Sequence, residues 1–154
     1  MLCYFPCLSE LEEFDAFIGS HFRAPLNNPL LFGRQLLMDE SDEIIGEKEE
    51  LLISSVDLSI DDVIREVRRR GGVVIPAHID RSSFSIISQL GFIPPEYGFR
   101  VMEVSASNCQ KFISDDQYTY ITSSDAHCLE DILERESYLH VETKSVAAIL
   151  ESLR

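Results

Sequence analysis

Residues 71–80 read Gly-Gly-Val-Val-Ile-Pro-Ala-His-Ile-Asp, and residues 118–127 read Tyr-Thr-Tyr-Ile-Thr-Ser-Ser-Asp-Ala-His. Each stretch is rich in β-branched or aromatic residues and ends in side chains able to bind a metal: His78 and Asp80 in the first, Asp125 and His127 in the second. In α/β proteins the functional groups lie at the carboxyl ends of parallel strands, where the following loops open to solvent. Both stretches therefore indicate a buried strand that leads into a functional site.

The spacing of the second pair suits a shared ligand. Side chains two positions apart point to the same side of an extended chain, so Asp125 and His127 could reach one cation together. A carboxylate and an imidazole favour Zn, Mn or Fe over Ca, which prefers oxygen ligands. The small residues Ser123, Ser124 and Ala126 leave room for a metal ion and a substrate.

The length and apolar content are typical of one globular domain. A chain of 154 residues is long enough to bury a core without disulfides, and 45% of its residues are hydrophobic. No apolar run approaches the length of a membrane span, and no secretory signal peptide is recognisable. We therefore expect a single domain over residues 1–154, no membrane partner and a cytoplasmic location.

The chain is strongly acidic. It carries 13 Lys and Arg against 27 Asp and Glu, which gives a formal net charge of −14. A surface of that sign repels phosphate backbones, so no strong nucleic-acid binding is expected. The four cysteines include no Cys-x-x-Cys pair and are expected to be reduced thiols; they are Cys3, Cys7, Cys109 and Cys128.

Local patterns predict alternating helices and strands. Ser59 is expected to cap a helix over 60–70, which Gly71 and Gly72 end before the strand that runs to His78. This order of helix, glycine stop and buried strand is typical of one unit of a parallel sheet. The other elements predicted are a strand at 2–5, a helix at 11–22 with Ser9 and Glu12 as a capping box, a hairpin at 36–45, helices at 84–90, 108–113, 129–133 and 145–153, and strands at 100–105, 118–122 and 138–141.

Several stretches resemble one known family. The motifs Ile75-Pro76-Ala77-His78-Ile79-Asp80 and Ser123-Ser124-Asp125-Ala126-His127 look like the third and fourth sequence motifs of the PHP (polymerase and histidinol phosphatase) superfamily. A likeness to the bacterial PHP-domain phosphoesterases extends to Gly91-Phe92-Ile93-Pro94-Pro95, Val101-Met102-Glu103-Val104-Ser105 and Leu2-Cys3-Tyr4-Phe5-Pro6. The resemblance thus covers essentially the whole chain.

The resemblance implies an α/β fold that is part of a distorted (β/α)7 TIM-like barrel, with divalent metals at the strand ends and a phosphoesterase (hydrolase) activity. By position, His78, Asp125 and His127 would be metal ligands, and the substrate would be a phosphate-ester small molecule or a nucleotide. Metals in such sites lower the pKa of a bound water and neutralise phosphoryl oxygens. Arg81 is our own candidate for a phosphate contact, because its guanidinium offers a fork of donors.

The motifs that open the family are not found in this sequence. They comprise a His-x-His strand end, an Asp-His pair, and a Glu and a His ahead of the strand that resembles residues 2–6. The sequence therefore resembles the carboxyl-terminal portion of a PHP domain, lacking its amino-terminal strands. Because such a portion would leave sheet edges open, we expect a homodimer or a complementing amino-terminal segment.

Three hypotheses about function follow from this comparison. The first is a metal-dependent phosphoesterase that is incomplete, and weak or inactive, as an isolated chain. The second is a non-catalytic PHP-derived relic or binding module with at most one residual metal site. The third is a truncated gene product, which an in-frame His-x-His strand in the DNA upstream of Met1 would reveal.

Overall fold

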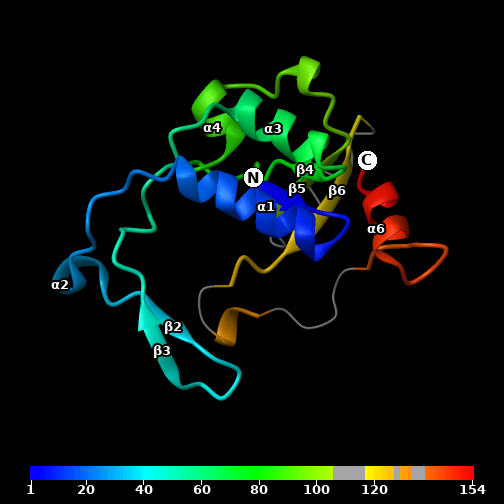
Figure 1. Cartoon of the computed structure of the whole chain (residues 1–154). Coiled ribbons are helices and arrows are strands. Elements are labelled where there is room, and N and C mark those ends of the chain that lie inside the picture. The colour runs from blue at the N-terminus through cyan, green and yellow to red at the C-terminus, as the bar shows by residue number, and fades with distance from the viewer. Residues whose placement is uncertain (106–116, 127–128, 133–137) are drawn as a thin grey trace.

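Helices and short strands are interspersed along the chain (Figure 1). The computed structural model describes residues 1–105, 117–126, 129–132 and 138–154. The strands are β1 (Leu2–Tyr4), β2 (Leu36–Met38), β3 (Ile44–Glu47), β4 (Val73–Ile75), β5 (Val101–Ser105) and β6 (Thr119–Ser123). The helices are α1 (Leu8–Ser20), α2 (Pro29–Phe32), α3 (Ile60–Arg69), α4 (Ile86–Leu90) and α6 (Val146–Ser152), with 3-10 turns at η1 (Pro95–Tyr97) and η3 (Leu129–Asp131).

β4 lies between β1 and β5. It pairs antiparallel with β1, with Leu2 opposite Ile75. Backbone hydrogen bonds of Glu103 link β5 to the segment that follows β4, and β5 pairs in parallel with β6 along its full length. The fold is therefore mixed α/β with small sheets, and within the described ranges the strands do not close into a barrel. The antiparallel direction of β1 differs from the parallel pairing of a (β/α) barrel.

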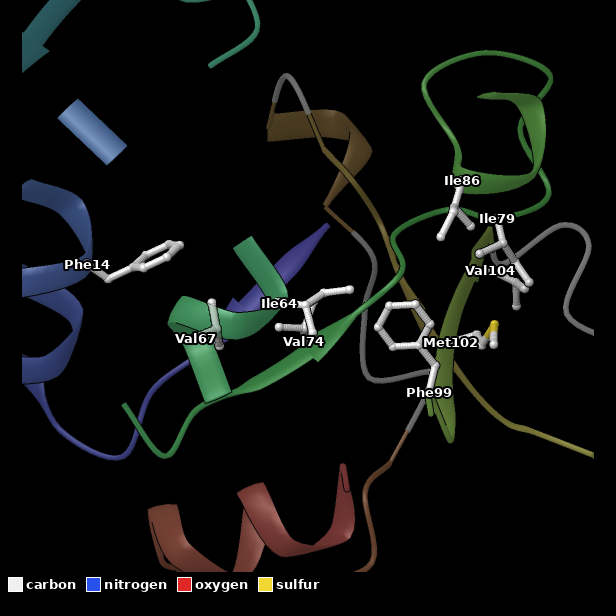
Figure 2. Packing of buried hydrophobic residues seen from close by; sticks show 9 residues of the cluster. All are labelled: Phe14, Ile64, Val67, Val74, Ile79, Ile86, Phe99, Met102 and Val104. Atoms are coloured by element: carbon white, nitrogen blue, oxygen red, sulfur yellow. The ribbon is translucent and has the colours of Figure 1, made fainter. Parts of the chain in front are cut away.

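Helices cover both faces of β4 and β5, which explains why both strands are rich in apolar residues without alternation. Successive side chains point to opposite faces, so the two strands contribute to two separate apolar clusters. The first cluster packs beneath α1, α3 and α4 and comprises Phe14, Ile64, Val67, Val74, Ile79, Ile86, Phe99, Met102 and Val104 (Figure 2). The second packs against α6 and comprises Val73, Ile75, Val101, Leu150 and Leu153.

Helix α3 confirms the helix predicted at 60–70. The Ser59 hydroxyl accepts a hydrogen bond from the Asp62 backbone N–H at 3.1 Å, and the Asp62 carboxylate accepts one from the Ser59 N–H at 3.2 Å, which completes a capping box. Hydrogen bonds from the Ser59 hydroxyl and then from Arg65 lower the pKa of Asp62 to about 2. Gly71 follows the helix with a φ of 69°, a left-handed conformation that suits glycine.

Other predicted elements agree with the structure in type. β2 and β3 form the hairpin expected at 36–45, and α4 and α6 lie within the helices expected at 84–90 and 145–153. Only the 3-10 turn η3 forms within the helix expected at 129–133, whose last residue is outside the described ranges, as is the whole of 108–113. Among the residues that the structure describes, no helix is long and apolar enough to cross a membrane.

Two local predictions are wrong. The expected capping box of Ser9 and Glu12 does not start the first helix, because α1 begins at Leu8 and Cys7 takes the N-cap position. The expected strand at 138–141 is not formed, and the side chains of Tyr138 and Leu139 are exposed. A short apolar run becomes a stable strand only where a neighbouring strand accepts its hydrogen bonds and a core covers one face.

The close approach of β1, α3 and β4 at Gly72 gives a test of this packing. A Cβ at Gly72 would lie 2.6 Å from the Tyr4 carbonyl oxygen and 2.7 Å from Val67 Cγ1, whereas a Cβ at Gly19 in α1 would meet no atom within 4 Å. We expect Gly72→Ala to lower the free energy of unfolding by about 1–3 kcal/mol through overpacking. Gly19→Ala is the matched control and should raise it by about 0.5–1 kcal/mol, because alanine favours the helix. Urea unfolding of both variants measures the difference, and equal effects would contradict the packing described.

Candidate functional site

An ion pair joins the two sequence motifs at the ends of their strands. Arg81 lies in the loop that follows β4, and Asp125 lies two positions beyond the end of β6. Arg81 Nη1 lies 2.8 Å from Asp125 Oδ2, and both side chains are partly exposed to solvent. The residues after β4 and β6 therefore meet across the carboxyl end of β5, which lies between the two strands.

The backbone bulges where the chain leaves β4. Glu103 donates its backbone N–H to the Pro76 carbonyl at 3.0 Å, and its carbonyl accepts from the Ile79 N–H at 2.9 Å. In regular parallel pairing these two partners are two positions apart, whereas Pro76 and Ile79 are three apart, so one extra residue is accommodated. His78 lies in this bulge with a φ of 32°. The bulge turns its backbone N–H toward the Glu103 carboxylate, whose Oε2 accepts it at 2.9 Å.

The Glu103 carboxylate connects β5 to the chain after β4 and to the end of β6. Its side chain projects from β5 and is almost completely buried, with 4% of the residue exposed. One oxygen accepts the His78 N–H after β4, and the other accepts a hydrogen bond from the Ser123 hydroxyl at the end of β6. A buried carboxylate is stable only when its oxygens accept hydrogen bonds in this way. Burial, and then the negative charge of Glu103, raise the pKa of Tyr4 on β1.

Sequence reasoning did not assign Glu103 to the site. The available signal was a single charged residue inside the otherwise apolar strand Val101–Ser105. Charged residues are rarely fully buried unless they are paired or hydrogen-bonded, so such an exception is a pointer to a structural or functional role. The partners of the carboxylate come from two other strand ends, which the sequence alone does not bring together.

Asp80 belongs to the same set of strand-end contacts. Its Oδ1 accepts the backbone N–H of Ser105, the last residue of β5, at 2.9 Å. This hydrogen bond satisfies the backbone donor at the end of β5. Asp80, which the sequence suggests as a possible metal ligand, therefore has a structural role here. The two acidic groups Glu103 and Asp80 thus fix the bulge after β4 against β5.

The imidazole of His78 has a buried nitrogen that no described residue satisfies. The side chain is partly buried, and its Nδ1 has no hydrogen-bond partner within the ranges that the structure describes. Buried polar atoms in folded proteins nearly always have a partner, and neutral imidazole nitrogens are common metal ligands. An imidazole nitrogen together with the carboxylate of Asp125 is a donor set that fits Zn, Mn or Fe.

Both predicted ligands in the described residues have left-handed backbones. His78 has a φ of 32° and Asp125 a φ of 47°, and positive values are uncommon for residues other than glycine. Such conformations concentrate at functional sites, where the surrounding structure holds them in place. Here the Glu103 carboxylate accepts the backbone N–H of His78, and the side chain of Asp125 pairs with Arg81.

The structure covers only part of the predicted ligand set. His127, the third predicted ligand, and its neighbour Cys128 lie outside the described residues. Within the described residues, no group of three or more His, Cys, Asp or Glu side chains is arranged to hold a metal ion. Among the described residues, Cys3 and Cys7 are free thiols.

Comparison of the chain with models of protein families, with curated proteins and with solved structures found no match. The geometry described above is therefore the structural basis on which a function can be proposed.

Removal of the Glu103 carboxylate should disrupt the strand ends. In Glu103→Ala the His78 N–H and the Ser123 hydroxyl lose their acceptor inside the protein, and we expect a loss of about 3 kcal/mol in the free energy of unfolding. Glu13→Ala, on the exposed side of α1, is the control and should change it by less than about 0.5 kcal/mol. Urea unfolding monitored by circular dichroism measures both; a Glu103→Ala protein as stable as the control would show that the carboxylate does not hold these strands.

Proposed function

We propose that this protein is a metal-dependent phosphoesterase of the PHP type, incomplete as an isolated chain, whose strands belong to a distorted (β/α)7 TIM-like barrel. The observation that carries the proposal is the ion pair between Arg81 and Asp125, which joins the loops that contain the two metal-ligand motifs. The buried, unsatisfied Nδ1 of His78 at the same strand ends supports it.

The metal ligands in this proposal are His78, Asp125 and His127. The first two are donors of the kinds that Zn, Mn and Fe accept, and both lie in loops at the carboxyl ends of the strands. When bound, the metal supplies a water of lowered pKa and neutralises the charge of the phosphoryl oxygens. Glu103 is a positioning residue, since it holds the backbone of His78 and touches neither substrate nor metal in this scheme.

Arg81 is the residue proposed to bind the phosphate group of the substrate. Its side chain is 44% exposed, so it can be reached from solvent while Nη1 is paired with Asp125. A guanidinium has five N–H donors in a planar fork, and a single ion pair leaves donors for phosphoryl oxygens. The substrate class that fits is a phosphate-ester small molecule or a nucleotide, because the overall negative charge disfavours long nucleic acids.

The open edges of the small sheets are the proposed contact for a partner. In the described part of the chain, β1 pairs with β4 on one side only, and β6 pairs with β5 on one side only. An unpaired strand edge can accept a strand from another chain. We therefore keep a second copy of this chain, or a complementing amino-terminal segment, as the partner that would complete the barrel and the ligand set.

A non-catalytic PHP-derived relic or binding module is the second candidate function. The observation that favours it is that the metal-ligand motifs that open the family are not found in this sequence. This candidate predicts at most one weakly held metal and no metal-dependent turnover, with or without a complementing segment. The two candidates therefore differ in metal-dependent activity.

Metal analysis tests whether the proposed site binds a metal. We expect the purified, untagged chain to contain about one equivalent of Zn, Mn or Fe by elemental analysis, because three ligands can hold one metal with open positions. The metal affinity of His78→Ala and of Asp125→Ala should fall at least tenfold, since loss of even an outer-shell partner typically costs about 10–100-fold in metal affinity. His140→Ala is the control, because His140 is exposed and remote from the motifs in sequence, and it should keep the metal.

The same samples are then assayed with p-nitrophenyl phosphate and bis(p-nitrophenyl) phosphate, with their mass in solution recorded. Metal-dependent hydrolysis that is lost in His78→Ala, alone or on addition of a complementing segment, supports the phosphoesterase. Bound metal without hydrolysis under any of these conditions supports the binding module. Equal metal content in His78→Ala and in the control would overturn the assignment of the site itself.

A further inference from the structure

The segment from residue 25 to residue 55, which we name the arm, projects away from the helices and strands that form the two clusters (Figure 1). It contains α2 and the β2–β3 hairpin, and hydrogen bonds define its base. The Asn27 N–H donates to the Glu49 carbonyl at 2.7 Å, and the Leu51 N–H donates to the Pro25 carbonyl at 2.9 Å. The arm is therefore a closed loop of chain with an antiparallel base.

A single side chain makes three hydrogen bonds to the backbone within the arm. Gln35 donates through Nε2 to the carbonyls of Lys48 and Glu50 at 2.9 and 2.8 Å, and its Oε1 accepts the Leu52 N–H at 2.9 Å. At the tip, Asp39 Oδ1 accepts the backbone N–H groups of residues 41 and 43, which fixes the turn between β2 and β3. Polar contacts thus set the shape of the arm.

The apolar side chains of the arm are left outside any core. None of its residues is buried, although it is rich in leucine and isoleucine. Leu30 and Leu31 of α2 are 96% and 74% exposed, and Ile53 is 71% exposed. The other exposed large apolar residues of the arm are Leu26, Phe32, Leu36, Leu37, Met38, Ile44, Ile45 and Leu52. An accumulation of this kind marks a surface that another molecule covers.

The charges of the arm identify the chemistry of that molecule. The arm contains seven carboxylates and only two cationic side chains, Arg34 and Lys48. Both cations are already paired inside the arm, Arg34 with Glu47 at 2.8 Å and Lys48 with Glu50 at 3.3 Å. The remaining carboxylates have no cationic partner among the described residues; they are Asp39, Glu40, Asp42, Glu43 and Glu49. The exposed apolar surface thus carries an excess of negative charge.

We propose that the arm binds a basic, amphipathic segment of a partner protein, which covers the apolar side chains and places lysines or arginines against the carboxylates. A hollow at the base of the arm offers both kinds of contact; it is lined by Leu26, Asn27, Pro29, Glu47, Lys48 and Glu49. A second copy of this chain and an anionic membrane are both negatively charged. Their repulsion by the carboxylates of the arm disfavours both as occupants. The proposal is independent of the phosphoesterase activity.

The test measures binding of a fluorescein-labelled 18-residue peptide in which leucines at helical spacing form one face and lysines the other. Fluorescence anisotropy is recorded with the full-length chain. We expect the Leu/Lys peptide to bind at least tenfold more tightly than a Ser/Lys peptide of the same charge. We also expect the affinity to fall as salt is raised. A Leu/Glu peptide of the same pattern should not bind.

Two sets of variants locate the binding on the arm. The triple variant Leu30→Ser, Leu31→Ser, Phe32→Ser should weaken binding of the Leu/Lys peptide at least tenfold, while the control Leu8→Ser, Phe84→Ser, Phe92→Ser, also exposed but outside the arm, should change it less than twofold. The charge reversals Glu40→Lys and Glu43→Lys should likewise weaken it, unlike Glu12→Lys and Glu13→Lys on α1. All of these positions are exposed, and circular dichroism verifies that each variant is folded.

The outcomes separate the possible occupants of the arm. Equal binding by the arm variants and their controls, or equal binding of the Ser/Lys peptide, would overturn the proposal by showing that general charge attraction suffices. A concentration-dependent dimer that the Leu30→Ser, Leu31→Ser, Phe32→Ser variant abolishes would overturn it in favour of a second copy. Weakening confined to the arm variants supports it.

Discussion

The buried carboxylate of Glu103 is the interaction on which the arrangement of the strand ends depends. It accepts the His78 N–H from the bulge after β4 and the Ser123 hydroxyl from the end of β6, while the backbone of the same residue pairs with Pro76 and Ile79. One residue of β5 therefore fixes its neighbours on both sides. Because the carboxylate is shielded from water, these bonds are strong, and their loss leaves buried donors unsatisfied. The loops that follow β4 and β6 thus begin at residues that Glu103 connects through β5.

The packing of helices on both faces of β4 and β5 accounts for the parts of the fold that are predictable from sequence. Val73, Val74 and Ile75 are all buried, so the strand is a continuous apolar run that is recognisable without knowledge of its partners. Helix α3 is likewise predictable, since Ser59 and Gly71 mark its two ends by local chemistry. The start of α1 differs from the prediction because Cys7 takes the N-cap position without a side-chain cap. Residues 138–141 form no strand, and no described strand pairs with them. The antiparallel direction of β1 depends on tertiary contacts and has no local signature.

The candidate site shows the same division between local and long-range information. The loops that carry His78, Arg81 and Asp125 were predicted to be neighbours from the strand ends alone, and the ion pair between Arg81 and Asp125 places them together. The role of Glu103 was not predicted, because it depends on donors that are distant in sequence. The metal-binding roles of His78, Asp125 and His127 remain predictions. Their proposed chemistry rests on donor type and on the buried Nδ1 of His78.

Val73 and Leu150, which meet in the second apolar cluster, are 77 positions apart in the chain. At a ribosomal rate of roughly 5–20 residues per second, about 4–15 s pass between the emergence of β4 and that of α6. During this interval the nascent chain presents one apolar face of β4 and β5 without its helix, so hydrophobic side chains such as Ile75 are accessible to chaperones. This layer therefore cannot form until α6 has been synthesised, 77 residues after β4.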